Sequence, residues 1–240
     1  MKKEVILMYS GGLDSLLSCV RLINEGYKVY LIHFDNGSSI GTENIQISAQ
    51  RLIERYKDKV EFLGIASTAA EFVYYRKLTN IENLNAEELN KKYGKISMSQ
   101  YRCLLCRMAM YTYSVALARK MNIKYIAEGA RKSQLFAIEQ EEILDEFKNF
   151  CNHYGIELLI PVFDLDDDYQ KENELLRYGF LPVANEGKCL LGYPMKRQLN
   201  QEEINDIKRL YQDIKYLQEK DIDQKRIVLT KLPKDKVRWY

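Results

Sequence analysis

Two groups of residues in this sequence have the types and spacing to do chemistry. The first is Tyr9-Ser-Gly-Gly-Leu-Asp-Ser15, which follows the apolar run Val5–Met8. Adjacent glycines let a backbone approach an anion closely, and a helix starting after Leu13 would add unpaired N–H groups and a positive dipole end. The two serines add hydroxyl donors, and Asp14 can hold a metal ion or cap the turn. This loop predicts a phosphate-binding site.

The second group is a set of three cysteines. Cys103 and Cys106 form a Cys-x-x-Cys at the expected start of a helix, and Cys189 lies in a later Glu-Gly-Lys-Cys-Leu-Leu-Gly segment. Helix N–H groups near the first two sulfurs would stabilise thiolates. Three thiolates suit a cubane cluster with one open iron, or a persulfide pair, better than structural zinc, which takes four ligands. A thioredoxin-like dithiol is an alternative that leaves Cys189 without a role.

The elements that must position these groups alternate short apolar runs with helical periodicity. This pattern predicts an α/β fold with a parallel five-stranded sheet and helices on both faces. The expected strands are Glu4–Tyr9, Lys28–His33, Val60–Ile65, Lys124–Glu128 and Glu157–Val162. The expected helices are Ser15–Asn24, Glu43–Tyr56, Cys103–Met121 and Gln140–Tyr154. Ligands of such sheets bind beyond the carboxyl ends of the strands, where the strand order reverses.

The chain divides into a catalytic domain, residues 1–195, and a C-terminal helix with a basic tail, residues 196–240. A polar insertion near 79–99 is interpreted as a mobile lid or as a surface excursion. Gln201–Lys220 has the spacing of an amphipathic helix that packs on the domain or on a partner. The tail, Lys225–Tyr240, interleaves basic and aromatic residues, which can contact phosphates and stack on bases.

Composition sets the remaining bounds. A chain of 240 residues that is 46% hydrophobic can bury one substantial core. With neither a signal peptide nor a membrane span in the sequence, we expect a cytoplasmic protein without a membrane partner. Five cysteines fit metal or sulfur chemistry better than disulfides, although Cys19 and Cys151 fall on apolar helix faces and are expected in the core. His33 and His153 lack a second ligand at metal spacing, which favours structural roles.

The Ser-Gly-Gly-Leu-Asp-Ser loop resembles that of the ATP pyrophosphatase (PP-loop) superfamily, whose members split ATP between its α and β phosphates and adenylate a substrate oxygen. The order and spacing of Cys103, Cys106 and Cys189 are similar to those of the PP-loop enzymes that make 2-thiocytidine or 2-thiouridine in tRNA. In those enzymes three cysteines hold a 4Fe–4S cluster. The resemblance covers most of residues 1–194, and it implies ATP, Mg²⁺ and a 4Fe–4S cluster, rather than zinc, as cofactors.

The resemblance also implies site residues. The loop would bind the ATP phosphates, the end of the second strand would meet the adenine, and Gly129 would approach the phosphates. The expected ATP-binding residues are Tyr9, Ser10, Gly11, Gly12, Leu13, Asp14, Ser15, Ile32, His33, Phe34, Gly129, Arg131 and Lys132. The expected catalytic residues are Asp14, Cys103, Cys106 and Cys189, and the three cysteines are also the expected metal ligands.

The chain departs from the tRNA thiolases at two places. It lacks the acid that they carry shortly after the glycine of the fourth strand, and offers Arg131 and Lys132 instead. These could clamp pyrophosphate or an acidic substrate, or form a solvated charged loop. Leu13 also stands where lysine is common. The Gly-Ala-Arg stretch beginning at Gly129 is similar to one in the phosphoadenylylsulfate reductases, which share the fold.

Together these features predict an AMP- and pyrophosphate-forming sulfur transferase. A carbonyl oxygen of a nucleobase, in tRNA or in a small molecule, would attack ATP, and sulfur from sulfide or a persulfide carrier would then displace AMP. The alternatives are an adenylyl-sulfate reductase-like enzyme, an amide- or nitrile-forming PP-loop ligase with zinc-bound cysteines, and a non-catalytic nucleotide sensor. A homodimer and the basic tail would help to hold a tRNA.

Overall fold

The central strand of the sheet carries a continuous apolar run because both faces of the sheet are covered. The computed structural model describes residues 3–41, 43–94, 96–190 and 197–231. In β1 (Lys3–Met8), Val5 and Leu7 pack into one hydrophobic cluster, while Ile6 and Met8 pack into another on the opposite face. A strand buried on both faces has no polar side, which explains the continuous apolar run in the sequence.

The described residues form a six-stranded sheet in the order β6-β5-β1-β2-β4-β8. Its strands are β1, β2 (Tyr27–Asp35), β4 (Val60–Ser67), β5 (Tyr125–Glu128), β6 (Glu157–Leu159) and β8 (Leu229–Thr230). The five predicted strands are all present and parallel, although β6 ends at Leu159 instead of Val162. β8 was not predicted, because a two-residue strand has no detectable period; it pairs antiparallel with β4.

The order of the strands creates a place for a ligand. From β1 the chain proceeds outward through β2 to β4, and then returns to β5 on the other side of β1. The connections after β1 and β5 therefore leave the sheet in opposite directions. A crevice is expected at the carboxyl ends of these two strands.

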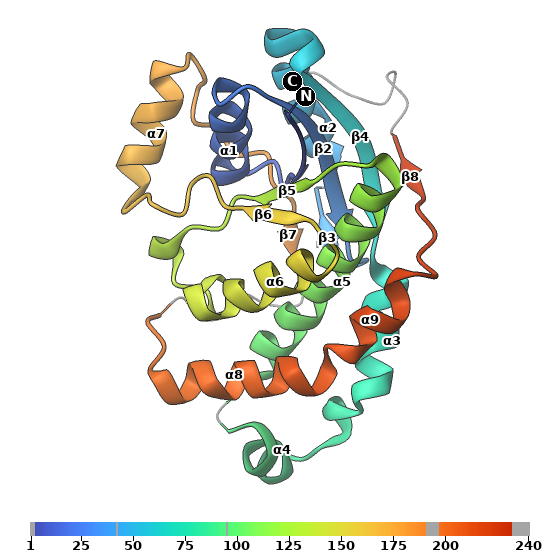
Figure 1. Ribbon diagram of the computed structural model, residues 1–240. Helices are drawn as coiled ribbons and strands as arrows, with labels where there is room; N and C mark the ends of the chain where they lie inside the picture. The colour runs from blue at the N-terminus through green and yellow to red at the C-terminus, as the bar shows by residue number, and fades with distance from the viewer. Residues whose placement is uncertain (1–2, 42, 95, 191–196, 232–240) are drawn as a thin grey trace.

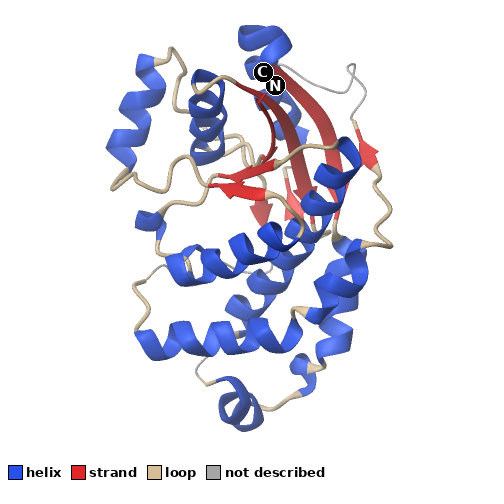
Figure 2. Cartoon of the chain, in the orientation of Figure 1, coloured by secondary structure: helices blue, strands red, loops and turns tan. Residues whose placement is uncertain are grey.

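Helices cover both faces of the sheet (Figures 1 and 2). They are α1 (Leu13–Asn24), α2 (Glu43–Tyr56), α3 (Ala69–Thr79), α4 (Ala86–Tyr93), α5 (Met98–Met121), α6 (Glu141–His153), α7 (Asp168–Arg177), α8 (Gln201–Ile214) and α9 (Tyr216–Ile222). The 3₁₀ turns are η1 (Lys57–Lys59), η2 (Ile81–Asn83), η3 (Lys132–Gln134) and η4 (Ala137–Glu139). α1 and α2 pack on the face of Val5, and α5 and α6 pack on the face of Ile6. No helix within the described ranges is long and apolar enough to cross a membrane.

The predicted helix at the cysteines begins earlier than expected, which corrects one chemical inference. α5 starts at Met98 because Ser97 and Gln100 form a capping box, a signal already present in the sequence. Cys103 therefore lies in the second turn of the helix and not at its start. Unpaired N–H groups belong only to the first four residues of a helix, so the expected stabilisation of thiolates by such groups is wrong.

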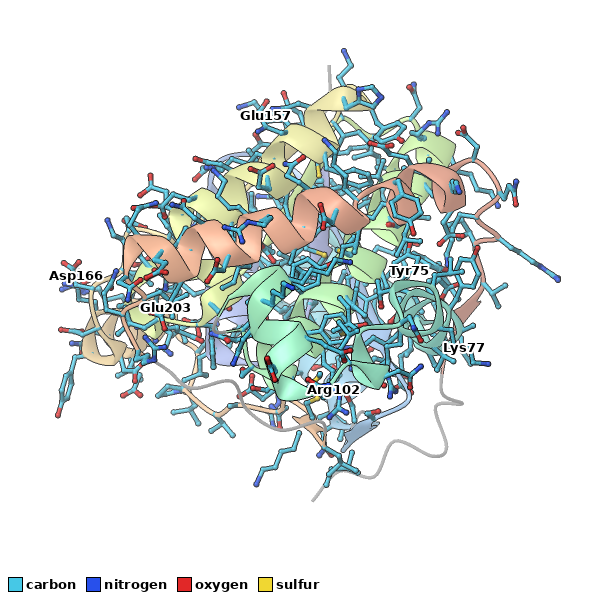
Figure 3. The ribbon with its side chains drawn as sticks, turned by 90° about the horizontal axis from the view of Figure 1, so that it is seen from below. Tyr75, Lys77, Arg102, Glu157, Asp166 and Glu203 are labelled. Carbon is cyan, nitrogen blue, oxygen red and sulfur yellow. The ribbon has the colours of Figure 1, made fainter. Side chains whose placement is uncertain are left out.

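The predicted insertion and the C-terminal segment pack together. Residues 79–99 contain η2 and α4, and Ile81, Leu89 and Tyr93 are buried in the same cluster as α5. The predicted amphipathic helix, Gln201–Lys220, is two helices in the structure: α8 ends at Ile214, and α9 follows it. Figure 3 shows α8 crossing the molecule between α4 and α6. The division at residue 195 stays a prediction, although α8 and α9 share the core of the preceding residues.

Candidate functional site

The loop between β1 and α1 presents the first turn of a helix to the crevice. Gly11 has a φ of +82°, a conformation that favours glycine, and Gly12 is the N-cap of α1. The hydroxyl of Ser10 accepts the Gly12 N–H at 3.2 Å, and the hydroxyl of Ser15 donates to the Gly12 carbonyl at 2.9 Å. Because glycine has no side chain to cap the helix, the N–H groups of the first turn can meet an anion.

Gly129 holds the end of β5 against the start of α1. A Cβ atom at this position would lie 2.8 Å from the Ser15 nitrogen and 2.9 Å from the Asp14 carbonyl carbon. Real Cβ atoms do not approach backbone so closely, so the contact requires glycine. The glycine thus joins the two chain segments on either side of the crevice.

A cavity of about 260 Å³ opens where these segments meet. The predicted residues that line it are Tyr9, Ser10, Gly12, Asp14, Ser15, His33, Phe34 and Gly129. It is also lined by residues that were not predicted, among them Arg107, Glu128, Gln134, Glu139 and Glu186. The structure thus brings the β1–α1 loop, the end of β2 and the end of β5 around one space, as the sequence predicts, although their role in binding ATP stays a prediction.

Three other predicted residues lie outside the cavity wall. Gly11 contacts the backbone of Asn185, Leu13 packs against the hydrophobic cluster of α1, and Ile32 is fully buried in the opposite cluster. Their positions fit a role in shaping the loop and the sheet edge.

The two predicted basic residues are also not among the residues that line the cavity. The guanidinium of Arg131 is 3.1 Å from Asp14 and 2.6 Å from Asp168. The Lys132 side chain is 73% exposed and lies 3.9 Å from Glu141. In this structure Arg131 serves to hold the Asp14 carboxylate, and Lys132 faces solvent.

Asp14 sits in a network of positive charge. Besides Arg131, the amine of Lys171 lies 3.4 Å from its carboxylate, and the side-chain amide of Gln134 donates to it. Lys171 and Arg131 also lower the pKa of Asp168, through hydrogen bonds and charge attraction. A Mg²⁺ ion could reach Asp14 only in competition with these two cations.

A second charged cluster forms part of the cavity wall. The carboxylate of Glu128 is 1% exposed and accepts hydrogen bonds from Arg107 and from the hydroxyl of Tyr111. The Arg107 guanidinium also lies 3.6 Å from Glu139. Burial raises the pKa of Glu139 to about 7, an increase that the charge of Arg107 opposes and that of Glu128 reinforces.

His33 lines the cavity from the end of β2. Its Nδ1 atom is 3.0 Å from the Tyr9 carbonyl, and burial lowers its pKa. Within the described ranges, Nε2 has no hydrogen-bond partner. A neutral ring with one nitrogen left for a ligand fits the predicted contact with a nucleotide base.

The three predicted cysteines converge near the carboxyl end of β2. The thiol of Cys106 accepts a hydrogen bond of 3.4 Å from the amide of Asn36, which follows β2. Cys189 ends β7 (Lys188–Cys189), and in a two-stranded antiparallel sheet it pairs with Ser39 of β3 (Ser39–Ile40). The cavity and the cysteines share α5, because Arg107 and Met110 belong to the cavity wall. Figure 1 shows β3 and β7 side by side below the sheet.

The thiols influence one another's ionisation. Burial raises the pKa of Cys103 to about 12, and the neighbouring Cys106 and Cys189 add to the increase. Burial also raises the pKa of Cys106, against a hydrogen bond from Asn36. In the part of the chain that the structure describes, no group of three His, Cys, Asp or Glu side chains is arranged to hold a metal ion. The cysteines are thus neighbours, and burial favours the protonated thiols of Cys103 and Cys106. Cys19 and Cys151 are fully buried in the core, as predicted.

One segment connects the cysteines with the loop between β1 and α1, which we call the phosphate loop after its predicted role. The N–H of Asn185 donates to the Gly11 carbonyl at 2.9 Å, and the N–H of Leu190 donates to the Ser38 carbonyl at 2.7 Å. Between these two hydrogen bonds, the carboxylate of Glu186 lies over Gly12. A Cβ atom added to Gly12 would lie 2.3 Å from Oε2 of Glu186. We call residues 185–190 the bridging segment.

Several of these residues carried a signal that sequence reasoning missed. Glu128 is a charge at the end of a predicted buried strand, and Arg107 follows Cys106 directly. A charged residue at the end of a buried strand, or directly beside a motif cysteine, indicates a side chain with a role in a functional site. Glu139 and Lys171 lie outside the motifs, and Glu186 belongs to the segment of Cys189, so only the tertiary structure brings these three residues to the loop that begins at Tyr9.

The fold and this site define a PP-loop protein of the ATP pyrophosphatase superfamily. A family model described as "Thiamine biosynthesis protein (ThiI)" matches residues 1–144, and the chain belongs to that family. It is 25% identical over 194 residues to the tRNA-specific 2-thiouridylase MnmA 1 of Syntrophus aciditrophicus (strain SB), a match that covers 77% of this chain and 50% of the relative. It is 23% identical over 132 residues to a probable tRNA sulfurtransferase of Thermococcus kodakarensis, covering 55% and 30% of the two chains. The chain thus spans half or less of these relatives.

Two solved structures share the fold. One is a 4-thiouridine synthetase in complex with RNA and bound ATP, with a TM-score of 0.58, 14% identity, and coverage of 92% of this chain and 53% of that chain. The other is the NMN synthetase from Francisella tularensis, with a TM-score of 0.50, 12% identity, and coverage of 95% and 89%. At these identities the likeness establishes the fold and leaves the reaction to the site.

Proposed function

We propose that this protein is an ATP-dependent sulfur transferase that adenylates a carbonyl oxygen of a nucleobase and replaces that oxygen with sulfur. The observation that carries the proposal is the bridging segment, which has the phosphate loop at one end and Cys189 at the other. Relatives named tRNA sulfurtransferase and 2-thiouridylase support tRNA as the acceptor. A free nucleobase is the alternative acceptor.

In the first step the ATP phosphates bind over the loop from Ser10 to Ser15, with the adenine near His33 and Phe34. The carbonyl oxygen of the base attacks the α-phosphorus. The bond from this phosphorus to pyrophosphate breaks, and pyrophosphate leaves. The N–H groups at the start of α1 stabilise the charge that develops on the leaving group. Mg²⁺ would enter with ATP, and because Asp14 is already paired with two cations, we assign no step to the metal.

In the second step hydrosulfide, or the outer sulfur of a cysteine persulfide, attacks the activated carbon, the bond to the AMP oxygen breaks, and AMP leaves. When the donor is a persulfide, a second cysteine thiol then attacks the sulfur held by the first cysteine, so that the S–S bond to the base breaks, the thiocarbonyl is released, and the two cysteines form a disulfide that an external thiol must reduce. Cys103, Cys106 and Cys189 are the proposed site from which this sulfur, from sulfide or a persulfide carrier, is delivered. Their soft sulfur donors are of the type that holds a 4Fe–4S cluster. Since their thiols are not arranged as ligands in this structure, we derive no step from a cluster.

Two alternatives receive less support. The reductase-like interpretation rests on Arg131, whose side chain pairs with Asp14 and Asp168 beside the cavity. The zinc-binding ligase needs a closed set of ligands, which the three cysteines do not supply. A nucleotide sensor differs from the proposed enzyme in one result, since it would not convert ATP to AMP.

One basic residue of the predicted tail is used inside the fold. Lys225 is 3% exposed and pairs with Glu71 and Asp221, so its charge is already used inside the fold. Arg226 and Lys231 are exposed. The basic and aromatic residues from 232 to 240 lie outside the described residues.

Replacement of one cysteine tests the proposal. We expect Cys189→Ser to abolish thiolation of an unmodified tRNA transcript, because serine cannot carry or deliver sulfur, and to leave the Kd for ATP unchanged within about twofold. Thiolated nucleoside is measured by mass spectrometry, and ATP binding by calorimetry. Iron and acid-labile sulfide are measured after anaerobic purification, and about four of each per chain in the wild type would identify the cluster.

Cys151→Ala is the matched control, because Cys151 is fully buried in the core and does not line the cavity. It should retain thiolation. Full sulfur transfer by Cys189→Ser would show that the three-cysteine site is wrong. Absence of AMP formation by the wild type with every tested acceptor would favour the sensor.

A further inference from the structure

The carboxyl group of Glu139 belongs to the cavity and has no role in the steps above. Glu139 ends η4 and lines the cavity together with Gly12, Asp14 and Ser15 of the phosphate loop. The residue is 8% exposed. Its Oε1 atom lies 3.6 Å from Arg107, and its Oε2 atom accepts the N–H of Arg131 at 3.5 Å. Both contacts are long, so the carboxyl group is placed in the cavity wall without being tightly held.

Its neighbour Glu128 is held differently. Glu128 accepts short hydrogen bonds from the Arg107 guanidinium and the Tyr111 hydroxyl, and burial raises the pKa of Tyr111, so the hydroxyl remains a donor. The charge of Arg107 is therefore mainly neutralised by Glu128. The two carboxyl groups of the cavity wall are thus held differently: Glu128 is paired with Arg107 and Tyr111, whereas Glu139 makes only long contacts and has a pKa that burial raises to about 7.

Three charged side chains and one backbone N–H group influence the ionisation of Glu139. They are Arg107 of α5, Glu128 of β5, Asp14 of α1 and the backbone N–H of Arg131 before η3. Glu128 and Asp14 disfavour ionisation of Glu139, while Arg107 and the N–H favour it. Burial is the largest influence and raises the pKa of Glu139 to about 7.

The proposed adenylation requires a proton acceptor when the reacting carbonyl adjoins a ring N–H. The oxygen of a neutral amide is a weak nucleophile, and attack without proton loss leaves a cationic product. If the ring N–H proton moves to a carboxylate as the oxygen–phosphorus bond forms, the ring becomes a neutral O-adenylyl imidate. Pyrophosphate leaves with the electron pair of the broken bond, and the proton ends on the carboxyl group.

We propose that Glu139 is the catalytic base of the adenylation step and takes the proton from the ring nitrogen beside the reacting carbonyl. The inference rests on the proposed function, because it assigns a residue to the first step of that reaction. Glu139 lines the same cavity as the phosphate loop. A general base must lie within hydrogen-bond reach of the proton that it takes.

The other titratable groups of the cavity are less suitable. Asp14 is paired with Arg131 and Lys171. Glu186 lies over Gly12, at the expected position of the phosphates. His33 is the strongest competitor, because it is neutral and its Nε2 is unpaired among the described residues, but it extends from the end of β2, where the adenine is expected.

Single-turnover kinetics test the assignment. The full chain is mixed with ATP, Mg²⁺ and an unmodified tRNA transcript, and pyrophosphate release is followed between about pH 5.5 and about pH 9. The wild-type rate should rise with pH and level off above about 7. Glu139→Gln should lose about 10²–10⁴-fold in rate and the dependence on pH, with the Kd for ATP unchanged within about twofold. Glu139→Asp, which keeps an ionisable carboxyl group, should retain a slower rate that still depends on pH.

Two further variants separate the outcomes. Glu157→Gln, an exposed glutamate at the start of β6, should behave as the wild type. His33→Gln should weaken ATP binding and keep the pH profile. The assignment is overturned if Glu139→Gln stays within about threefold of the wild type, if Glu139→Asp and Glu139→Gln lose the same amount, or if His33→Gln abolishes the pH dependence. If the wild type releases no pyrophosphate with any acceptor, the proposed function itself fails.

Discussion

Glu139 links the stability of the protein to pH at the scale of one residue. Burial raises its pKa from 4.5 to about 7. The fold favours the neutral form, so its contribution to stability is complete below the unfolded pKa and is lost as pH rises through the folded pKa. We expect the free energy of unfolding of the wild type to fall, relative to Glu139→Gln, by about 2 kcal/mol between about pH 5 and about pH 8.5.

Urea denaturation of both proteins at the two pH values measures this difference. Because every other titrating group is common to both chains, the comparison isolates Glu139. Glu157→Gln serves as the control and should follow the wild type at both pH values. A gap between wild type and Glu139→Gln that is the same at both would contradict the raised pKa.

Single residues were predictable where the signal is local. The stretch from Tyr9 to Ser15 contains its own turn and helix start, so its position at the crevice follows from neighbouring residues alone. The orientation of Arg131 was not predictable. Its sequence suggests a clamp for pyrophosphate, but the partner that turns it toward Asp14 is Asp168, which long-range packing supplies.

At the scale of elements, the contact between β5 and α1 depends on one missing side chain. Gly129 is not among the glycines with positive φ, so Gly129→Ala changes only sterics, placing a Cβ 2.8 Å from the Ser15 nitrogen. The start of α1 must then move away from β5. We expect a loss of about 1–3 kcal/mol in the free energy of unfolding and a clear weakening of nucleotide binding. Urea denaturation and ATP titration measure the two effects.

Gly26→Ala is the matched control for this variant. Gly26 has a φ of +88°, and among the described residues no atom lies within 4 Å of the position that a Cβ would take, so alanine introduces backbone strain without a clash. It should lose about 1 kcal/mol and keep its affinity for ATP. Equal losses of affinity in both variants would show that general destabilisation, and not the position of α1, is the cause.

The elements themselves were predictable in proportion to their length and period. The five parallel strands and α2 follow directly from apolar runs and helical spacing. α3 was missed because Val73, Tyr74 and Leu78 are exposed and obscure its buried face. The start of α5 was predictable from Ser97 and Gln100, which form its capping box. A helix start placed at Cys103 led to the wrong expectation that free N–H groups stabilise the thiolates.

For the whole molecule, the C-terminal helices complete the core. Seven large residues of α8 and α9 are buried in the cluster of α5, namely Ile204, Ile207, Leu210, Tyr211, Ile214, Leu217 and Ile222. Gln218 bonds to the Met108 carbonyl, and the Tyr113 hydroxyl bonds to the backbone of Val228. Each buried side chain contributes about 1.5–3 kcal/mol, and their sum is comparable to the whole stability of a typical domain.

We therefore expect a chain that ends at Asn200 to lose cooperative unfolding. Thermal melts followed by circular dichroism, with dye binding to exposed apolar surface, measure this. A chain that ends at Lys231 is the control and should melt close to the full chain. A cooperative melt of the shorter chain near the temperature of the full chain would support the division at residue 195.

The position of Glu186 over Gly12 has a consequence for the coupling of two binding equilibria. If the ATP phosphates bind over Gly12 as proposed, they and the Glu186 carboxylate repel each other and cannot share the loop, so ATP would displace Glu186 from its present position. Cys189 lies at the other end of that segment. By thermodynamic reciprocity, whatever factor ATP imposes on the docking of β7 against β3 is the factor by which docking of β7 weakens ATP. In the proposed mode of binding, nucleotide occupancy and the approach of Cys189 to the other two cysteines would thus be coupled.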